Sequence, residues 1–247
     1  MKRTLGRIFS DSYVNRKTVG ENHILLLMYR FAYPFAVLLD RLHLSPNQIT
    51  TLSFGCAVFA FAALVYDAGW AWFSVFWGLA VLLDFCDGTV ARMADKVSKN
   101  AFRYDHMSDL FKISLIILGV GIRYNEALVW VMAFSASFAF LYGDALNREV
   151  HLAINRLPSG ENAAPLGQGA RTGAGARVAA WLSGYGTLYA LVKNIRAALL
   201  TVNGHTLLLF FICPLGAEIV VWGFSYLILI ELRAIRSRIA LLVSMRR

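Results

Sequence analysis

Charged residues are scarce in this sequence, and their scarcity excludes an ordinary soluble domain. Asp, Glu, Lys and Arg make up 16% of the 247 residues, whereas about 25% is typical of soluble domains. Hydrophobic residues reach 58%, against about 45–50% in soluble proteins, and the mean hydropathy is +0.56. We therefore expect an integral membrane protein that forms one domain of several spans.

Cysteine is also scarce, since only Cys56, Cys86 and Cys213 occur and no two of them form a CxxC pair. This spacing argues against a disulfide framework and a zinc site, and small buried apolar residues account for all three. The glycine-rich segment 157–176 does not follow a strand, so it predicts a flexible loop or lid rather than a dinucleotide site. No small-residue cleavage site is evident after the polar N-terminus, so no signal peptide is expected.

Long apolar stretches are abundant, and a spanning helix needs about 20 mostly apolar residues. Residues 22–43 are apolar but interrupted by three charged residues, which predicts an amphipathic helix lying in the membrane interface. Ser45 and Pro46 then mark a helix start. Lys193 and Arg196 fall in a later apolar stretch, where they either line a cavity or indicate an interfacial segment. Six spans are predicted, at about 47–66, 70–91, 101–122, 127–146, 178–200 and 206–232.

The predicted fold is an all-α integral membrane protein with six transmembrane helices after the interfacial helix. We expect residues 1–43 to form a cytoplasmic N-terminus with that helix, 44–235 the six-helix membrane domain, and 236–247 a basic cytoplasmic tail. Basic residues concentrate after spans two, four and six, on the side of the basic N-terminus, which places both termini in the cytoplasm. Contacts with anionic membrane lipids account for the net charge of +9 without a nucleic-acid partner.

Four aspartates form the most informative pattern in the sequence. Asp84 and Asp87 lie at the end of the second span, and Asp105 and Asp109 lie near the start of the third. Because residues three or four apart share a helix face, antiparallel packing of the two spans would bring all four carboxylates together near the cytoplasmic side. Clustered carboxylates in a membrane helix are costly, so cations have to neutralise them.

The side chains of this cluster also indicate which cations they bind. Carboxylate oxygens favour Mg²⁺ or Mn²⁺ over zinc or copper. Two such ions, typically about 3.5–4 Å apart, would neutralise the charges and clamp a diphosphate. Gly88 and Ala91 continue the same face without bulk, so a nucleotide could lie there, and Arg92 could reach a phosphate oxygen.

The residues from Asp84 to Asp109 resemble the signature of a known family, the class I CDP-alcohol phosphotransferases. The signature D-x2-D-G-x2-A-R-x8-G-x3-D-x3-D is met at Asp84, Asp87, Gly88, Ala91, Arg92, Asp105 and Asp109. Ala101 departs from it, because the family has a second glycine at this position, and its methyl group lies near the expected nucleotide pocket. The segment from Ser45 to Thr50 also looks like the family's opening of its first span.

The resemblance implies transfer of a phosphatidyl group from CDP-diacylglycerol to the hydroxyl of a small polar alcohol, with release of CMP, in phospholipid biosynthesis. It implies that Asp84, Asp87 and Asp105 are metal ligands, and that Asp109 is a ligand or the general base. Family members are often homodimers. We expect a multi-pass protein, in a bacterial cytoplasmic membrane, with its active site facing the cytoplasm.

Two other functions remain open at this point. The same motif fits a CDP-linked small alcohol as donor and diacylglycerol as acceptor, because both reactions share the CDP-diphosphate site. A metal-binding transporter or an inactive scaffold belongs to another class. A transporter should show repeats or broken helices near the midplane, and the sequence contains no convincing internal repeat.

Some charged residues outside the signature have two interpretations. His106 either touches the acceptor or a phosphate, or packs and contacts headgroups. Lys112 is a functional candidate because it is an intramembrane charge, or it pairs with Asp109 or Asp144. Two interpretations also apply to four arginines, Arg148, Arg156, Arg171 and Arg177. They either recognise a phosphate on the acceptor, or they are ordinary positive charges of cytoplasmic segments.

Overall fold

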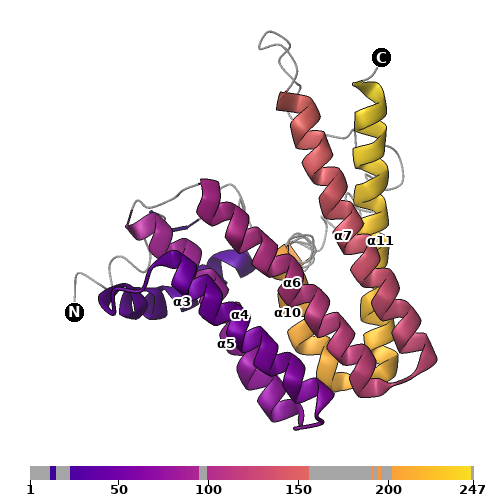
Figure 1. Cartoon of the computed structure of the whole chain (residues 1–247), viewed down its shortest axis with the longest axis horizontal. Coiled ribbons are helices and arrows are strands. Elements are labelled where there is room, and N and C mark those ends of the chain that lie inside the picture. Colours follow the sequence, from indigo (N-terminus) through magenta and orange to yellow (C-terminus); the bar gives the residue numbers. More distant parts are fainter. Residues whose placement is uncertain are drawn as a thin grey trace.

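The structure is a computed structural model that describes residues 12–14, 23–94, 99–155, 191, 194–195 and 202–245 (Figure 1). In these segments the regular elements are all helical, which confirms the all-α prediction. The helices are α3 (His23–Arg41), α4 (Pro46–Val65), α5 (Trp70–Met93), α6 (Lys99–Tyr124), α7 (Ala127–Asn155), α10 (Val202–Ile212) and α11 (Ala217–Ser244), with the 3₁₀ turn η1 (Cys213–Leu215) before the last.

The first four predicted spans agree with the helices. α4, α5 and α6 begin and end within two residues of the predicted limits, and α7 begins where predicted but continues to Asn155. The predicted loop 157–176 and most of the predicted fifth span, 178–200, lie outside the described residues.

The predicted sixth span, 206–232, is wrong as a single helix. α10 ends at Ile212, and α11 begins only after η1 and Gly216. Pro214 lacks an N–H donor and its ring blocks the preceding turn, so the helix breaks there. Gly216 takes a φ of 115°, which a residue without a side chain adopts readily. α11 then continues past residue 235, where the predicted tail begins.

The start of α4 is fixed by its capping residues, as predicted. Ser45 Oγ accepts a hydrogen bond of 3.3 Å from the Gln48 amide, and the Ser45 amide donates to Gln48 Oε1 at 2.8 Å. Pro46 occupies the first turn of the helix, where its missing N–H is not needed. This reciprocal capping box sets the register of α4, and therefore which of its polar residues face the interior.

α4, α5 and α6 form the core of the fold, with α4 packed along both of the others. Ala57 and Ala60 of α4 are fully buried, and small side chains allow helices to approach closely. At Gly119 of α6 a Cβ atom would fall 2.8 Å from the ring of Phe61 of α4, so a larger residue there would force neighbouring side chains to shift. α3 covers α5, and α7 and α11 lie side by side (Figure 1).

Four of the described helices are long and apolar enough to cross a membrane: α3, α4, α5 and residues Ala127–Ile154 of α7. This property fits the predicted membrane protein. The N-terminal apolar stretch is a helix, α3, but its position in the interface remains a prediction. α6 is not among the four, and it carries Asp105, Asp109 and Lys112 on one side.

Candidate metal centre

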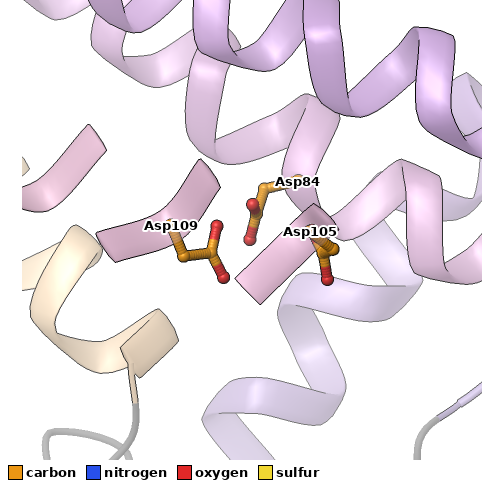
Figure 2. A group of neighbouring side chains, drawn as sticks. All are labelled: Asp84, Asp105 and Asp109. Atoms are coloured by element: carbon orange, nitrogen blue, oxygen red, sulfur yellow. The ribbon is translucent and has the colours of Figure 1, made fainter. Parts of the chain in front are cut away.

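The end of α5 and the beginning of α6 bring together three of the four predicted aspartates. One carboxylate oxygen from each of Asp84, Asp105 and Asp109 lies within 4.8 Å of the other two. Figure 2 shows the Asp84 and Asp109 carboxylates directed into the same space, with Asp105 beside them. The two helices therefore present a set of oxygen ligands from residues 21 to 25 positions apart in the sequence.

Asp87 lies next to this group but outside it. Its side chain is 3% exposed, and its Oδ2 accepts a hydrogen bond of 2.7 Å from Thr50 Oγ1 of α4. The carboxyl group of Asp87 also interacts electrostatically with that of Asp105 across the interface between α5 and α6. The fourth carboxylate is thus held by α4 on one side and faces the cluster on the other.

Thr50 is expected to orient Asp87, and its hydroxyl can be removed without a change in shape. Thr50→Val should weaken Mn²⁺ binding or slow turnover by about 10- to 100-fold, because outer hydrogen-bond partners hold metal-ligating carboxylates in place. Mn²⁺ titration of the purified protein measures the first quantity and CMP release the second. Thr50→Ser retains the hydroxyl and should stay near the original values.

The neighbouring Thr51 provides a matched control for this prediction. Thr51 Oγ1 contacts the Tyr104 hydroxyl at 2.8 Å on an exposed face, away from Asp87. Thr51→Val should therefore change Mn²⁺ binding by less than about twofold. Equal losses in Thr50→Val and Thr50→Ser would show that the hydroxyl of residue 50 does not position Asp87.

Lys112 occupies the interior of the cluster. Its ammonium forms ion pairs with Asp84 and with Asp109, the latter at 2.7 Å, and donates to Ser53 Oγ at 3.1 Å. The predicted pairing with Asp109 is confirmed, and the alternative with Asp144 is wrong. A buried lysine is stable in such a place because the opposite charges offset its desolvation.

Arg92 stands at the edge of the site. Its Nε donates to the Tyr13 carbonyl at 2.6 Å, and its guanidinium lies over the Tyr29 ring, 5.2 Å from the centroid. A Cβ atom at Gly88 would lie 3.1 and 3.2 Å from the terminal guanidinium nitrogens, so Arg92 fills the space left by that glycine. Ala91 is half-buried at the preceding position. A nucleotide at this face would therefore meet the guanidinium as well as the backbone.

The residues at the cluster fit a divalent cation. Asp105 Oδ1 is buried and has no hydrogen-bond partner among the described residues, which is unfavourable unless another group satisfies it. A hard cation ligated by oxygen is such a group, and Asp84 and Asp109 supply further oxygens. The side chain of Ala101, the position that departs from the family signature, lies outside the described side chains.

A second polar cluster connects α6 to α7. His106 Nε2 lies 2.7 Å from Asp144 Oδ1, and Arg148 forms an ion pair of 2.8 Å with Asp144 Oδ2. Arg148 is thus paired within the protein, while Arg156, Arg171 and Arg177 lie outside the described residues. A cavity of about 420 Å³ beside this cluster is lined mainly by apolar residues of both helices, with Asp144, Arg148 and Glu149.

Sequence reasoning did not identify three residues that surround the cluster: Thr50, Ser53 and Tyr29. Thr50 and Ser53 are polar residues three positions apart in an apolar helix, and this spacing was the available signal, because it places both hydroxyls on one face. Tyr29 gave no such signal. Its contact with Arg92 depends on how α3 packs against α5.

Residues 43–152 match the sequence model of the CDP-alcohol phosphatidyltransferase family. The match contains α4, α5 and α6 and nearly all of α7, and so includes every position of the aspartate signature. A comparison with curated proteins gave no match.

Residues 43–152 therefore resemble a family of transferases that move phosphate-linked groups. Specifically, the family that they match is that of the CDP-alcohol phosphatidyltransferases, which confirms the family resemblance. This family transfers a phosphate-linked group from a CDP-alcohol to an acceptor alcohol and uses divalent metal.

Proposed function

We propose that this chain transfers a phosphatidyl group from CDP-diacylglycerol to the hydroxyl of a small polar alcohol, releasing CMP, in phospholipid biosynthesis. The observation that carries the proposal is the convergence of Asp84, Asp105 and Asp109 within 4.8 Å, inside a domain of this family. Convergent carboxylates suit the binding of cations that neutralise a diphosphate, which is the group that joins cytidine to the transferred phosphate in such a donor.

The cofactor in this proposal is two divalent cations, Mg²⁺ or Mn²⁺, held by Asp84, Asp87, Asp105 and Asp109. Bound there, they would offset the charge of the diphosphate and of the leaving CMP. The buried, unsatisfied Asp105 Oδ1 supports this assignment. Thr50 positions Asp87, and Gly88, Ala91 and Arg92 form the edge at which the donor binds. One terminal nitrogen of Arg92, Nη2, is buried and has no hydrogen-bond partner among the described residues, so it can donate to a phosphate oxygen.

The transfer step follows from these positions. The acceptor hydroxyl forms a bond to the phosphorus distal to cytidine, while the bond from that phosphorus to the oxygen of CMP breaks. The hydroxyl proton has to leave at the same time, and Asp109 is the carboxylate assigned to receive it. Asp109 is 8% exposed and is held by Lys112, so its orientation is fixed and bulk water is largely excluded.

The proposal includes a membrane arrangement. The domain spans the bilayer six times after an interfacial N-terminal helix, with the site on the cytoplasmic side and a homodimer as the assembly. The four apolar helices support the membrane location. The positive charge of the segments next to the end of α5 supports the cytoplasmic side, because basic residues are retained there.

A panel of donors and acceptors tests the proposed reaction. Purified protein in lipid nanodiscs receives CDP-diacylglycerol with Mg²⁺ or Mn²⁺ and, separately, glycerol phosphate, inositol phosphate, serine, ethanolamine or choline. CMP release together with a new phospholipid mass supports the proposal. Turnover only with a CDP-linked small alcohol and diacylglycerol would contradict the proposed donor. It would show that the small alcohol is carried by the donor and that diacylglycerol is the acceptor. Absence of turnover with every pair, while metal still binds, would contradict the enzyme function.

A further inference from the structure

Lys112 is the most deeply buried charge in the described part of the cluster. Its side chain is 2% exposed, and it lies one turn after Asp109 on α6. A lysine on a helix surface can extend its long stem toward water, where its charge is hydrated. Lys112 points instead into the helix interface, so its position depends on partners in the protein.

Three helices supply those partners. Ser53 on α4, Asp84 on α5 and Asp109 on α6 each contact the ammonium. The ammonium donates hydrogen bonds to Ser53 Oγ and to Asp84, and its charge is paired with that of Asp109. The lysine therefore forms the polar junction of the three core helices.

Ser53 is oriented to accept rather than donate at this junction. Its Oγ donates its one hydrogen to the Ala80 carbonyl at 2.8 Å, so a lone pair remains for Lys112. Ser53 is fully buried, and a buried hydroxyl held in this way has one orientation. The groups around Lys112 Nζ are thus hydrogen-bond acceptors and carboxylates, which favour a positive charge at this position.

The ammonium also occupies oxygens that a metal would use. Asp84 and Asp109 are two of the three residues whose oxygens converge in the cluster, and Lys112 pairs with both. A positive charge near a divalent cation repels it, most strongly where water is excluded. Lys112 and a metal in this cluster therefore oppose each other.

We propose that Lys112 is a fixed counter-cation of the aspartate cluster, which stabilises the metal-free fold and weakens the binding of divalent cations at Asp84 and Asp109. The inference rests on the cation site of the proposed function. It makes Lys112 a positioning residue that acts through the carboxylates. It also means that the cluster is partly neutralised before any metal binds.

The variant that tests this role is Lys112→Met, which retains the stem and removes the charge. In a chelator, its midpoint of thermal unfolding should fall by roughly 6 °C or more, because carboxylates lose their buried partner. Saturating Mn²⁺ should remove most of that difference, since the metal replaces the lost charge. The dissociation constant for Mn²⁺, measured by titration on the purified protein, should decrease at least about tenfold.

Two further variants separate this role from simple packing. Arg148→Met removes a basic residue that is paired outside the cluster, and should leave Mn²⁺ affinity within about twofold. Ser53→Ala retains the lysine but releases one of its partners, so its Mn²⁺ affinity should fall between those of the original protein and Lys112→Met. If Lys112→Met does not fold in the chelator, a Mn²⁺ affinity of Ser53→Ala above that of the original protein still supports the role of the junction.

Other outcomes would overturn the inference. A loss of stability in Lys112→Met that is the same with and without Mn²⁺, with unchanged Mn²⁺ affinity, would make Lys112 a packing residue only. Unchanged affinity in Ser53→Ala would contradict the role of the junction. Failure of the original protein to bind Mn²⁺ would overturn both this inference and the cation site of the proposed function.

Discussion

Asp84→Asn should reduce CMP release by at least about 10³-fold, because loss of a carboxylate ligand removes several kcal/mol of charge stabilisation from the transition state. Asp84 is at the centre of the arrangement, since its carboxylate converges with those of Asp105 and Asp109 and pairs with Lys112. Asp87→Asn and Asp105→Asn should show losses of the same order. The measurement is the initial rate of CMP release under saturating donor and acceptor, with folding checked by thermal unfolding.

Asp67→Asn is the matched control for this prediction. Asp67 lies in the turn between α4 and α5, where it pairs with Arg123, and it is exposed. Its φ is 52°, a conformation that asparagine tolerates as readily as aspartate. The same chemical change should therefore leave CMP release within about twofold. Near-normal rates in Asp84→Asn and Asp105→Asn would refute the assignment of the cluster as a metal centre.

Removal of divalent cations should abolish turnover in the original protein. Treatment with a chelator should lower CMP release to the background rate, since the diphosphate is then opposed by carboxylates whose charge Lys112 offsets only in part. Added Mg²⁺ or Mn²⁺ should restore the rate, because both accept all-oxygen ligands. The dependence of the initial rate on Mn²⁺ concentration gives the apparent affinity of the site.

A physical control shows whether metal removal acts on chemistry or on the fold. Lys112 retains its ion pairs with Asp84 and Asp109 in the chelator, so the protein should remain folded at the assay temperature without metal. Full turnover after exhaustive chelation would contradict a metal-dependent transfer. Unfolding at the assay temperature after chelation would instead show that the metal is needed for folding.

Local signals in the sequence predicted the helices of the site closely. Ser45 and Pro46 set the start of α4 through backbone groups within one turn, and no distant contact is needed for that. Helix geometry predicted that each pair of aspartates lies on one helix face, because residues three or four apart share a face. The break between α10 and α11 was also readable at Pro214, but a continuous apolar stretch outweighed that signal in the predicted span.

The sequence by itself determined the aspartate pattern, the family that residues 43–152 match, and the limits of the two helices that carry the aspartates. Only the tertiary structure decided which charges meet. It placed Asp87 against Thr50, Arg92 against Tyr29, and Lys112 between Asp84 and Asp109. The physical reason is the distance along the chain over which each property is set. Which residues share a helix face depends on a few neighbouring positions. Each of these contacts depends instead on how separate helices pack, which helix periodicity does not encode.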